Sequence, residues 1–381
     1  MVAGFPTEAA SKTESRGSRG RGHSPTRICG PAPPARADPP RPSPPPKRPG
    51  YPVPMPDPPP AFTTTREVAD GEFVRMESRF RRWVSTEPGA EFPVEPGRYH
   101  LYVSLACPWC HRTAIVRLLK GLEDVVGISY AHPFRDERGW AFPGGRFEDG
   151  PGGEYVDQVN GWAFMSSAYI ATDPDYDARV SVPVLWDIAT GQIVSNESAD
   201  IIRMFDSPNS LGGLGNESPR LYPAQLRPEI DEVNERVYAT VNNGVYLAGF
   251  ARRQGAYERA FERLFASLEW LEDRLASRRY LVGDTITEAD WRLFPTLVRF
   301  DEVYHLHFRL NRRRIVEYPA LWDYVRELYQ WREVAETVAM EQIKRHYYTT
   351  HDELNPKHII PVGPAPDFWL PHTRAALAVG G

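Results

Sequence analysis

Two cysteines stand three residues apart in Cys107-Pro108-Trp109-Cys110, directly after an apolar run that is typical of a buried strand. The residues that follow have the apolar spacing of a helix, so Cys107 is expected where the strand ends and the helix begins. Unpaired backbone N–H groups and the positive end of the helix dipole lower the pKa of a thiol in that position. We therefore predict that the sulfur of Cys107 is a nucleophile.

Other roles for these cysteines agree less well with the sequence. A structural zinc site needs four ligands, and the chain has neither a second cysteine pair nor a well-spaced histidine pair, so no metal is expected. An inert, buried thiol does not explain why a proline and a helix start follow Cys107. Cys110 is expected one helical turn further along, either as a packed thiol or as a second redox group.

Two motifs further along the chain suit a ligand with peptide groups and charges. Pro183 in Ser181-Val182-Pro183 precedes an apolar run, where a cis bond would turn the backbone outward to pair with a peptide; an ordinary edge-strand proline is the alternative. Glu197 and Ser198 open the helical sequence NESADIIRMF. Their carboxylate and hydroxyl can hold the γ-glutamyl end of glutathione, although a plain N-cap has the same residue types.

The elements around these motifs follow the order β-α-β, insert, β-β-α. Apolar runs at 98–106 and 125–134 are typical of strands, with a helix between them at 107–123. Residues 179–205 contain two β-rich runs joined by the turn sequence ATGQ, and then a helix that begins between Asn196 and Ser198. This order predicts a thioredoxin-like α/β domain.

Strand patterns disappear after Pro223, and helical patterns follow. Thr287 and Asp290 form a capping-box pattern at the start of one helix. Another helix has apolar residues at three- and four-residue spacings: Tyr257, Phe261, Leu264, Phe265, Leu268, Leu271 and Leu275. The predicted organisation is a disordered Pro- and Arg-rich tail at 1–60, a thioredoxin-like domain at 61–210, an all-α domain at 220–348 and an extended C-terminal segment at 349–381.

Charge and composition limit the partners. Residues 1–60 hold 18 of the 38 prolines, with nine Lys/Arg against four Asp/Glu, so this segment cannot bury enough surface to fold. This segment has three alternative interpretations: an SH3-type ligand, a transit peptide, or an extension upstream of the true start. Residues 61–381 then carry a net charge of −10, which gives no electrostatic reason to expect nucleic acid or an anionic membrane as partner.

The cysteine count and the apolar runs indicate the compartment. Three cysteines, with Cys29 in the tail, cannot form a disulfide framework for 381 residues, which favours a reducing cytoplasm. The sequence has no apolar run of about 18 residues and no apolar start of the secretory type. We expect neither a membrane span nor a signal peptide.

With these motifs in this order, the chain resembles the glutathionyl-hydroquinone reductases, also called Xi-class or omega-like glutathione transferases. The resemblance implies the glutathione transferase fold, a thioredoxin-like α/β domain followed by an all-α domain, and a homodimer. It extends over about residues 70–368. The segments that carry it are GRYHLYVSLACPWCHRTAIVRLLKGLE, RGWAF, RVSVPVLWD, SNESADIIRMF, NNGVYLAGFA, TEADWRLFPTLVRFDEVYHLHF and AETVAMEQIKRHYYTTHDELNP.

The reaction that the resemblance implies is that of an oxidoreductase acting on a sulfur group in quinone detoxification. With glutathione as co-substrate, the glutathionyl group is removed from a hydroquinone thioether, giving hydroquinone and glutathione disulfide. Cys107 would attack the conjugate's sulfur and become a mixed disulfide, while Tyr246 protonates the departing ring carbon. Tyr304 and Tyr347 would lower the pKa of the thiol through hydrogen bonds, with Tyr348 as the alternative to Tyr347.

The resemblance also implies a set of glutathione contacts, in which Arg179 meets the glycyl carboxylate. The implied contacts are Trp140, Arg179, Val180, Ser181, Val182, Glu197 and Ser198. Cys110 departs from the pattern, because the family more usually has Ala there. A glutaredoxin-like disulfide or dehydroascorbate reductase that uses both cysteines is therefore an alternative, as are a ring-conjugating transferase and a non-catalytic binding protein of the same fold.

Overall fold

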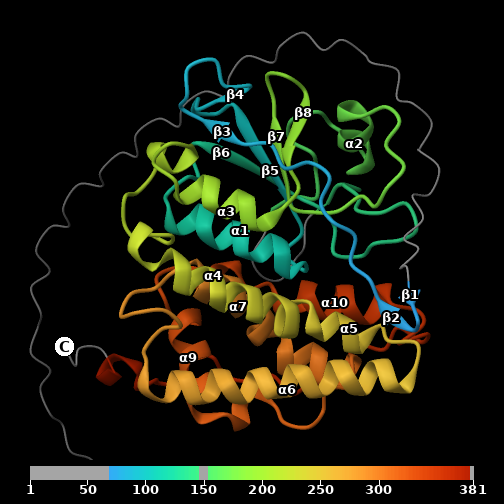
Figure 1. The fold of residues 1–381 in the computed structure, drawn as a ribbon. Coiled ribbons are helices and arrows are strands. Elements are labelled where there is room, and N and C mark those ends of the chain that lie inside the picture. The colour runs from blue at the N-terminus through green and yellow to red at the C-terminus, as the bar shows by residue number, and fades with distance from the viewer. Residues whose placement is uncertain (1–67, 146–152, 378–381) are drawn as a thin grey trace, which may run out of the picture. The chain divides into compact units, whose positions relative to one another are not determined.

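A four-stranded mixed sheet with strand order β6-β5-β7-β8 forms the centre of the N-terminal part of this computed structural model, which describes residues 68–145 and 153–377 (Figure 1). β5 (Tyr99–Val103) pairs in parallel with β6 (Val126–Tyr130). On its other side it pairs antiparallel with β7 (Val184–Asp187), which pairs antiparallel with β8 (Gln192–Ser195). All five residues of β5 are buried, which explains its unbroken apolar sequence.

Three helices accompany this sheet. α1 (Pro108–Leu119) packs against α3 (Ser198–Asp206), and α2 (Ser166–Thr172) contacts β8 (Figure 1). The crossover β5-α1-β6 is the predicted β-α-β unit. α1 ends four residues before the predicted boundary, because Gly121 has a φ of +60° that breaks the helix.

The segment before β5 contains four strands of two residues each, which the sequence analysis did not predict. β1 (Val68–Ala69) pairs antiparallel with β2 (Glu72–Phe73), and β3 (Val84–Ser85) pairs in parallel with β4 (Phe92–Pro93). β2 contacts the helical part of the molecule (Figure 1). Strands this short have no periodicity that a sequence pattern can detect.

The C-terminal part is helical in the residues that the structure describes. Its α-helices are α4 (Arg227–Val237), α5 (Gly244–Gly249), α6 (Gln254–Ser277), α7 (Glu288–Arg299), α8 (His305–His307), α9 (Pro319–Tyr329) and α10 (Met340–Thr350). π-helical turns cover Tyr238–Asn242 and Phe300–Tyr304, and 3-10 turns cover Leu211–Leu214, Ala224–Leu226, Ile315–Glu317, Val334–Thr337 and Arg374–Leu377. The predicted capping box of Thr287 and Asp290 is confirmed at the start of α7.

A buried carboxylate links the two parts. Glu288 at the start of α7 is 1% exposed and forms ion pairs with Arg203 of α3 and Arg292 of α7. It also accepts a hydrogen bond from Asn234 of α4. Because three helices converge on one carboxylate whose charge is paired, this network holds the helical part against α3.

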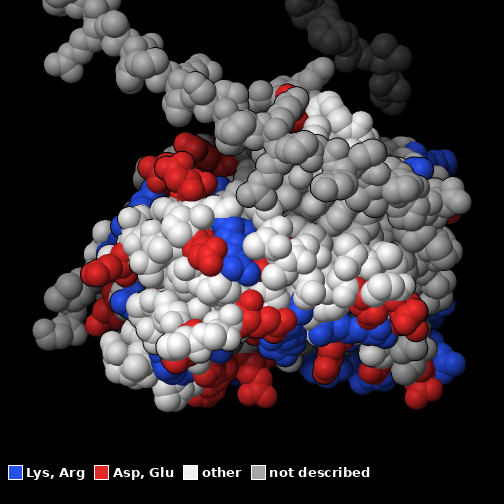
Figure 2. All heavy atoms as spheres, turned by 90° about the horizontal axis from the view of Figure 1, so that it is seen from above, with Lys and Arg blue, Asp and Glu red and all other residues white. Residues whose placement is uncertain are grey.

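The predicted tail at 1–60 lies outside the described residues, and residues 351–373 contain no helix or strand. Within the described part, every helix is too short or too polar to cross a membrane. Figure 2 shows acidic and basic side chains interspersed among the described residues of the visible face. Such a mixture gives this face no uniform basic field for a polyanion.

Candidate active site

Cys107 is the N-cap of α1, with Pro108 at the first helical position. Its sulfur lies 3.7 Å from the carbonyl oxygen of Val182, and the Val182–Pro183 bond is cis, the one of the two alternatives at Pro183 that suits a peptide ligand. The residue is 8% exposed, and it lines the two cavities described below. Two segments 75 residues apart in the chain therefore meet at this sulfur.

The surroundings of Cys107 favour its thiolate. Burial alone raises the pKa of this thiol, but the thiol of Cys110 and the backbone N–H groups of Cys110 and Trp109 stabilise the anion more strongly. The positive charge of Arg299 adds to them, and the resulting pKa is lowered to about 6. Most Cys107 sulfurs are therefore ionised at neutral pH.

Arg299, a residue that the sequence analysis missed, supports the loop before Cys107. It lies at the end of α7, is fully buried, and donates hydrogen bonds to the carbonyls of Leu105 (2.9 Å) and Pro295 (2.8 Å). It also bonds Nδ1 of His111 at 2.8 Å. Burial and the Arg299 charge hold the pKa of His111 well below its usual range, so this ring is neutral and its Nδ1 accepts. These hydrogen-bond partners of Arg299 are all neutral, so its positive charge remains available to favour the Cys107 thiolate.

One cavity beside Cys107 contains most of the predicted glutathione contacts. Its lining includes Trp140, Arg179, Ser181, Val182, Glu197 and Ser198, together with Arg75 and Arg292 from outside the predicted set. Val180 is buried and is not part of this lining. The cavity therefore joins the cis-proline loop, the N-terminus of α3 and the thiol.

Glu197 is the N-cap of α3. One carboxylate oxygen accepts a hydrogen bond from the N–H of Ala199 at 3.0 Å, and the other accepts from the hydroxyl of Ser78 at 3.1 Å. Ser198 follows at the first helical position and remains on the cavity wall. A fixed carboxylate beside a hydroxyl at a helix N-terminus can bind an amine and a carboxylate of one ligand.

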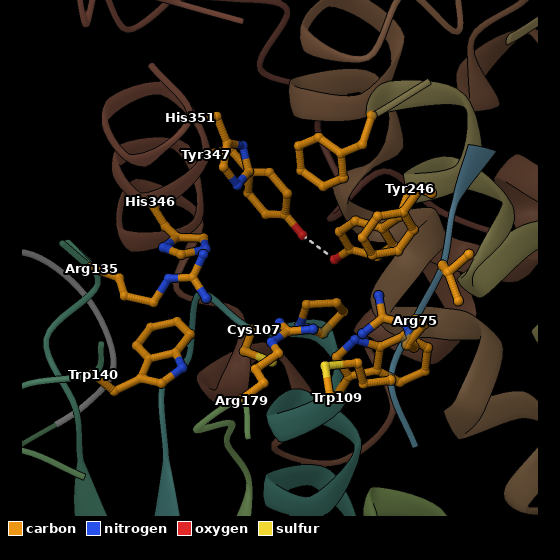
Figure 3. A pocket seen from close by; sticks show the side chains of 15 residues that line it. Arg75, Cys107, Trp109, Arg135, Trp140, Arg179, Tyr246, His346, Tyr347 and His351 are labelled. Carbon is orange, nitrogen blue, oxygen red and sulfur yellow. Dashed lines mark hydrogen bonds between the residues drawn. The ribbon is translucent and has the colours of Figure 1, made fainter. Parts of the chain in front are cut away.

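A second cavity also reaches Cys107 and is mainly aromatic (Figure 3). Its lining includes Phe73, Trp109, Trp140, Tyr246, Phe250, His346, Tyr347 and His351. Figure 3 shows Tyr246 and Tyr347 pointing toward each other above the cysteine. A flat aromatic group can stack in such a space while it remains next to the sulfur.

The structure brings the three predicted tyrosines together. The hydroxyl of Tyr347 lies 2.5 Å from that of Tyr246 and 3.0 Å from that of Tyr304. Tyr304 is fully buried behind the other two, and Tyr348 instead donates to the carbonyl of Glu302. Of the neighbouring pair, Tyr347 is thus the one that faces the site.

Burial raises the pKa of Tyr246, Tyr304 and Tyr347 above the ordinary phenol value, so each keeps its proton at neutral pH. Tyr246 is therefore able to donate a proton. The described hydrogen bonds of these hydroxyls run among the tyrosines themselves rather than to Cys107. Their role in lowering the pKa of the thiol stays a prediction.

Arg75 and Arg135 are further residues of the aromatic cavity that no sequence motif indicated. Arg75 donates to the side chain of Asn243 at 2.7 Å and lies over the rings of Trp109 and Tyr246. Burial, together with the charges of Arg75 and Arg135, lowers the pKa of Arg179 to about 10. At that pKa Arg179 is charged at neutral pH, and together with Arg75 and Arg135 on the wall of the same cavity it creates a positive field beside Cys107, which favours anions.

The described residues contain no group of three or more His, Cys, Asp or Glu side chains that is arranged to hold a metal ion. The site instead combines an ionised cysteine at a helix N-terminus, a cis-proline loop and a ring of protonated phenols. Together with the sheet order and the helical second part, these features define a cysteine-type glutathione transferase fold.

Comparison with known proteins supports this class. The models of the glutathione S-transferase N-terminal and C-terminal domains match residues 106–207 and 254–327. The chain is 48% identical over 297 residues to the glutathionyl-hydroquinone reductase PcpF of Sphingobium chlorophenolicum, covering 77% of this chain and 90% of that protein. It is 46% identical over 310 residues to the glutathionyl-hydroquinone reductase YqjG of Escherichia coli, covering 80% and 92%.

Solved structures agree. The Xi glutathione transferase from Phanerochaete chrysosporium superimposes with a TM-score of 0.74 at 47% identity, covering 80% of this chain and 96% of that one. The glutathione-bound structure of YqjG gives a TM-score of 0.73 at 45% identity, covering 78% and 96%. The chain belongs to the family of the glutathionyl-hydroquinone reductases, the Xi-class glutathione transferases. The predicted fold class and the predicted family are confirmed.

Proposed function

We propose that this protein is a glutathionyl-hydroquinone reductase, which uses glutathione to remove the glutathionyl group from aromatic thioethers. The observation that carries this proposal is that Cys107 lines both cavities, the polar one and the aromatic one. A single sulfur is thus within reach of a peptide-like group on one side and a ring on the other. A thioether between glutathione and a hydroquinone has this division.

The polar cavity is the proposed glutathione site. Glu197 binds the γ-glutamyl amine, Ser198 and the N-terminus of α3 bind the γ-glutamyl carboxylate, and the backbone of Val182 pairs with the cysteinyl residue. Arg179 meets the glycyl carboxylate, while Trp140 borders both cavities. The predicted contact of Val180 is proposed only through its backbone, since its side chain is buried away from the cavity.

The reaction proceeds in two thiol steps. The Cys107 thiolate attacks the sulfur of the conjugate, a Cys107–glutathione disulfide forms, and the carbon–sulfur bond breaks. The ring carbon takes the bonding electrons together with a proton from Tyr246, which Tyr347 orients and whose pKa burial keeps high. A second glutathione thiolate attacks the mixed disulfide, releasing glutathione disulfide and the Cys107 thiolate.

We also propose that the protein acts as a cytoplasmic homodimer and that its domains have the boundaries predicted from the sequence. The glutaredoxin-like alternative retains one specific support, because a second thiol, that of Cys110, stabilises the Cys107 anion. In that reaction the substrate is a disulfide, and no ring carbon needs a proton.

A direct test mixes the protein with a glutathionyl-hydroquinone and glutathione, and follows hydroquinone release by chromatography. The proposal predicts catalytic release that requires glutathione and is lost in Cys107→Ser. Release that survives this substitution, or no release by the wild type, would contradict it. Turnover of dehydroascorbate or a small disulfide without release of hydroquinone would favour the glutaredoxin-like alternative.

A further inference from the structure

A second thiol lies directly behind the reactive one. Cys107 is the N-cap of α1 and Cys110 is its third helical residue. An α-helix places Cα atoms three residues apart at roughly 5 Å, within the range of about 4.4–6.8 Å that a disulfide requires. Both thiols are free, and the Cys110 thiol is close enough to stabilise the Cys107 anion.

The two thiols differ in exposure. Cys107 lines both cavities, whereas Cys110 is 0% exposed and belongs to neither lining. A tripeptide or an aromatic conjugate can therefore reach the sulfur of Cys107 alone. Any disulfide chemistry of Cys110 has to pass through Cys107.

The surroundings of Cys110 keep its thiol protonated until Cys107 has reacted. Burial and the charge of Cys107 raise the pKa of Cys110, so it holds its proton while Cys107 is ionised. Once Cys107 is bonded to glutathione, that negative charge is gone. The N–H of Ser104, 3.4 Å from the Cys110 sulfur, and the charge of Arg299 then favour ionisation of Cys110.

We propose that Cys110 resolves the mixed disulfide on Cys107, so that the enzyme passes through an internal Cys107–Cys110 disulfide. This inference rests on the proposed function. The Cys110 sulfur attacks the Cys107 sulfur, the bond to glutathione breaks, and glutathione leaves with the proton that Cys110 gives up. Two further glutathiones reduce the internal disulfide through a new mixed disulfide on Cys107, so the products of the overall reaction do not change.

The consequence is that glutathione leaves Cys107 before any free glutathione is needed, and free glutathione is consumed only when the internal disulfide is reduced. In the oxidised enzyme the Cys107 sulfur would be part of a disulfide until a thiol reduces it. The disulfide protects this sulfur from further oxidation. An enzyme that has only Cys107 would remain glutathionylated under the same conditions.

The test uses the full-length, reduced and desalted protein with one equivalent of a glutathionyl-hydroquinone and no free thiol. After acid quenching, mass spectrometry of alkylated peptides reports glutathione on Cys107 or a Cys107–Cys110 disulfide. Wild type is expected to release both hydroquinone and glutathione and to form the internal disulfide. Cys110→Ala is expected to release hydroquinone and to keep glutathione on Cys107. Cys29→Ser, which removes the remaining cysteine of the chain, is expected to behave as wild type.

A second arm loads Cys107 with glutathione disulfide instead of the conjugate, so that it does not depend on hydroquinone chemistry. Internal disulfide in this arm without hydroquinone release in the first would support the role of Cys110 and contradict the proposed function. A glutathione adduct equally persistent in wild type and Cys110→Ala, in both arms, would overturn the inference. If Cys110→Ala does not fold, as checked by circular dichroism, Cys110→Ser serves as the comparison, and the wild-type product alone still decides the outcome.

Discussion

The two sides of the Cys107 sulfur are built in different ways. On the polar side, the contacts come from two helix N-termini and a proline loop, at Cys107, Glu197 and Val182–Pro183. On the aromatic side, Tyr246 and Tyr347 come from separate helices and meet across 101 residues of chain. Helix termini and a proline loop therefore position the first side, whereas the second side depends on hydroxyls and rings from helices far apart in the chain.

We infer that the two sides have different functions. The polar side activates the thiol and binds glutathione, whereas the aromatic side binds and protonates the leaving ring. A thioredoxin-like domain alone offers the first function through its helix termini. The second needs the helical part, because a carbon leaving group requires a proton and a space for its ring. Substitutions on the two sides should therefore have separable effects.

The largest expected effect is at the sulfur that both sides share. Cys107→Ser replaces the thiolate with a hydroxyl that stays protonated at neutral pH, so hydroquinone release should fall by about three orders of magnitude or more. Steady-state release measured by chromatography checks this. A loss of less than about tenfold would mean that another group is the nucleophile.

On the aromatic side, Tyr246→Phe keeps the ring and removes the proton donor. Hydroquinone release should fall by about two orders of magnitude, while reduction of a small disulfide by glutathione stays nearly constant, because a thiolate leaving group needs no proton on carbon. Both rates are measured on the same preparation.

The matched control for Tyr246→Phe is Tyr348→Phe, whose hydroxyl bonds the carbonyl of Glu302 away from the cavities. It should cost about 1 kcal/mol of stability and leave both rates within about twofold. Equal loss of both activities in Tyr246→Phe would refute the separation of the two sides.

Support of the thiolate from the helical part is tested at Arg299. Alkylation of Cys107 by iodoacetamide should rise with pH through a midpoint near 6 and level off above it, because only the thiolate reacts. In Arg299→Met this midpoint should move to higher pH, with about tenfold slower alkylation below it. The free energy of unfolding should fall by roughly 2–5 kcal/mol, since buried carbonyls lose their donor.

Arg312→Met is the control for the loss of an arginine. Arg312 is exposed and pairs with Glu262 at the surface, so neither the alkylation midpoint nor the unfolding free energy should change appreciably. An unchanged alkylation profile in Arg299→Met would show that the N-terminus of α1 activates the thiol without help from the helical part.

The smallest effect is expected on the polar side. Glu197→Gln keeps a hydrogen-bond acceptor for Ala199 but removes the charge for the γ-glutamyl amine. KM for glutathione should rise about fivefold, equivalent to about 1 kcal/mol, with kcat at saturation nearly constant. Asp200→Asn, which alters the next carboxylate of α3 where it pairs with Arg81, should change KM much less. A lower kcat with constant KM would mean that Glu197 acts on the reaction and not on binding.

The fold could be predicted wherever local patterns are strong. The β-α-β unit, the capping box of α7 and the apolar stripe of α6 follow from spacing over short stretches. The segment around β1–β4 could not be predicted, because its strands are only two residues long and so have no periodicity that a sequence pattern can detect.

The site divides in the same way. The positions of Cys107 and of Glu197 at the starts of two helices were predicted from local motifs, whereas the cis bond before Pro183 was one of two alternatives there. The roles of Tyr246, Tyr304 and Tyr347 were implied only by the family resemblance and not by a local motif. The roles of Arg75 and Arg299 could not be predicted, because they depend on contacts with residues that are distant in the sequence and adjacent only in the folded chain.

The most direct test of the central claim is a rapid-quench single turnover of Cys110→Ala with a glutathionyl-hydroquinone. In this variant glutathione stays bound to Cys107, because the thiol that is proposed to displace it is absent. Hydroquinone and glutathionylated Cys107 are expected to appear together, in equal amounts and with one rate constant. Hydroquinone released without glutathione on Cys107, or before it, would contradict attack by this sulfur.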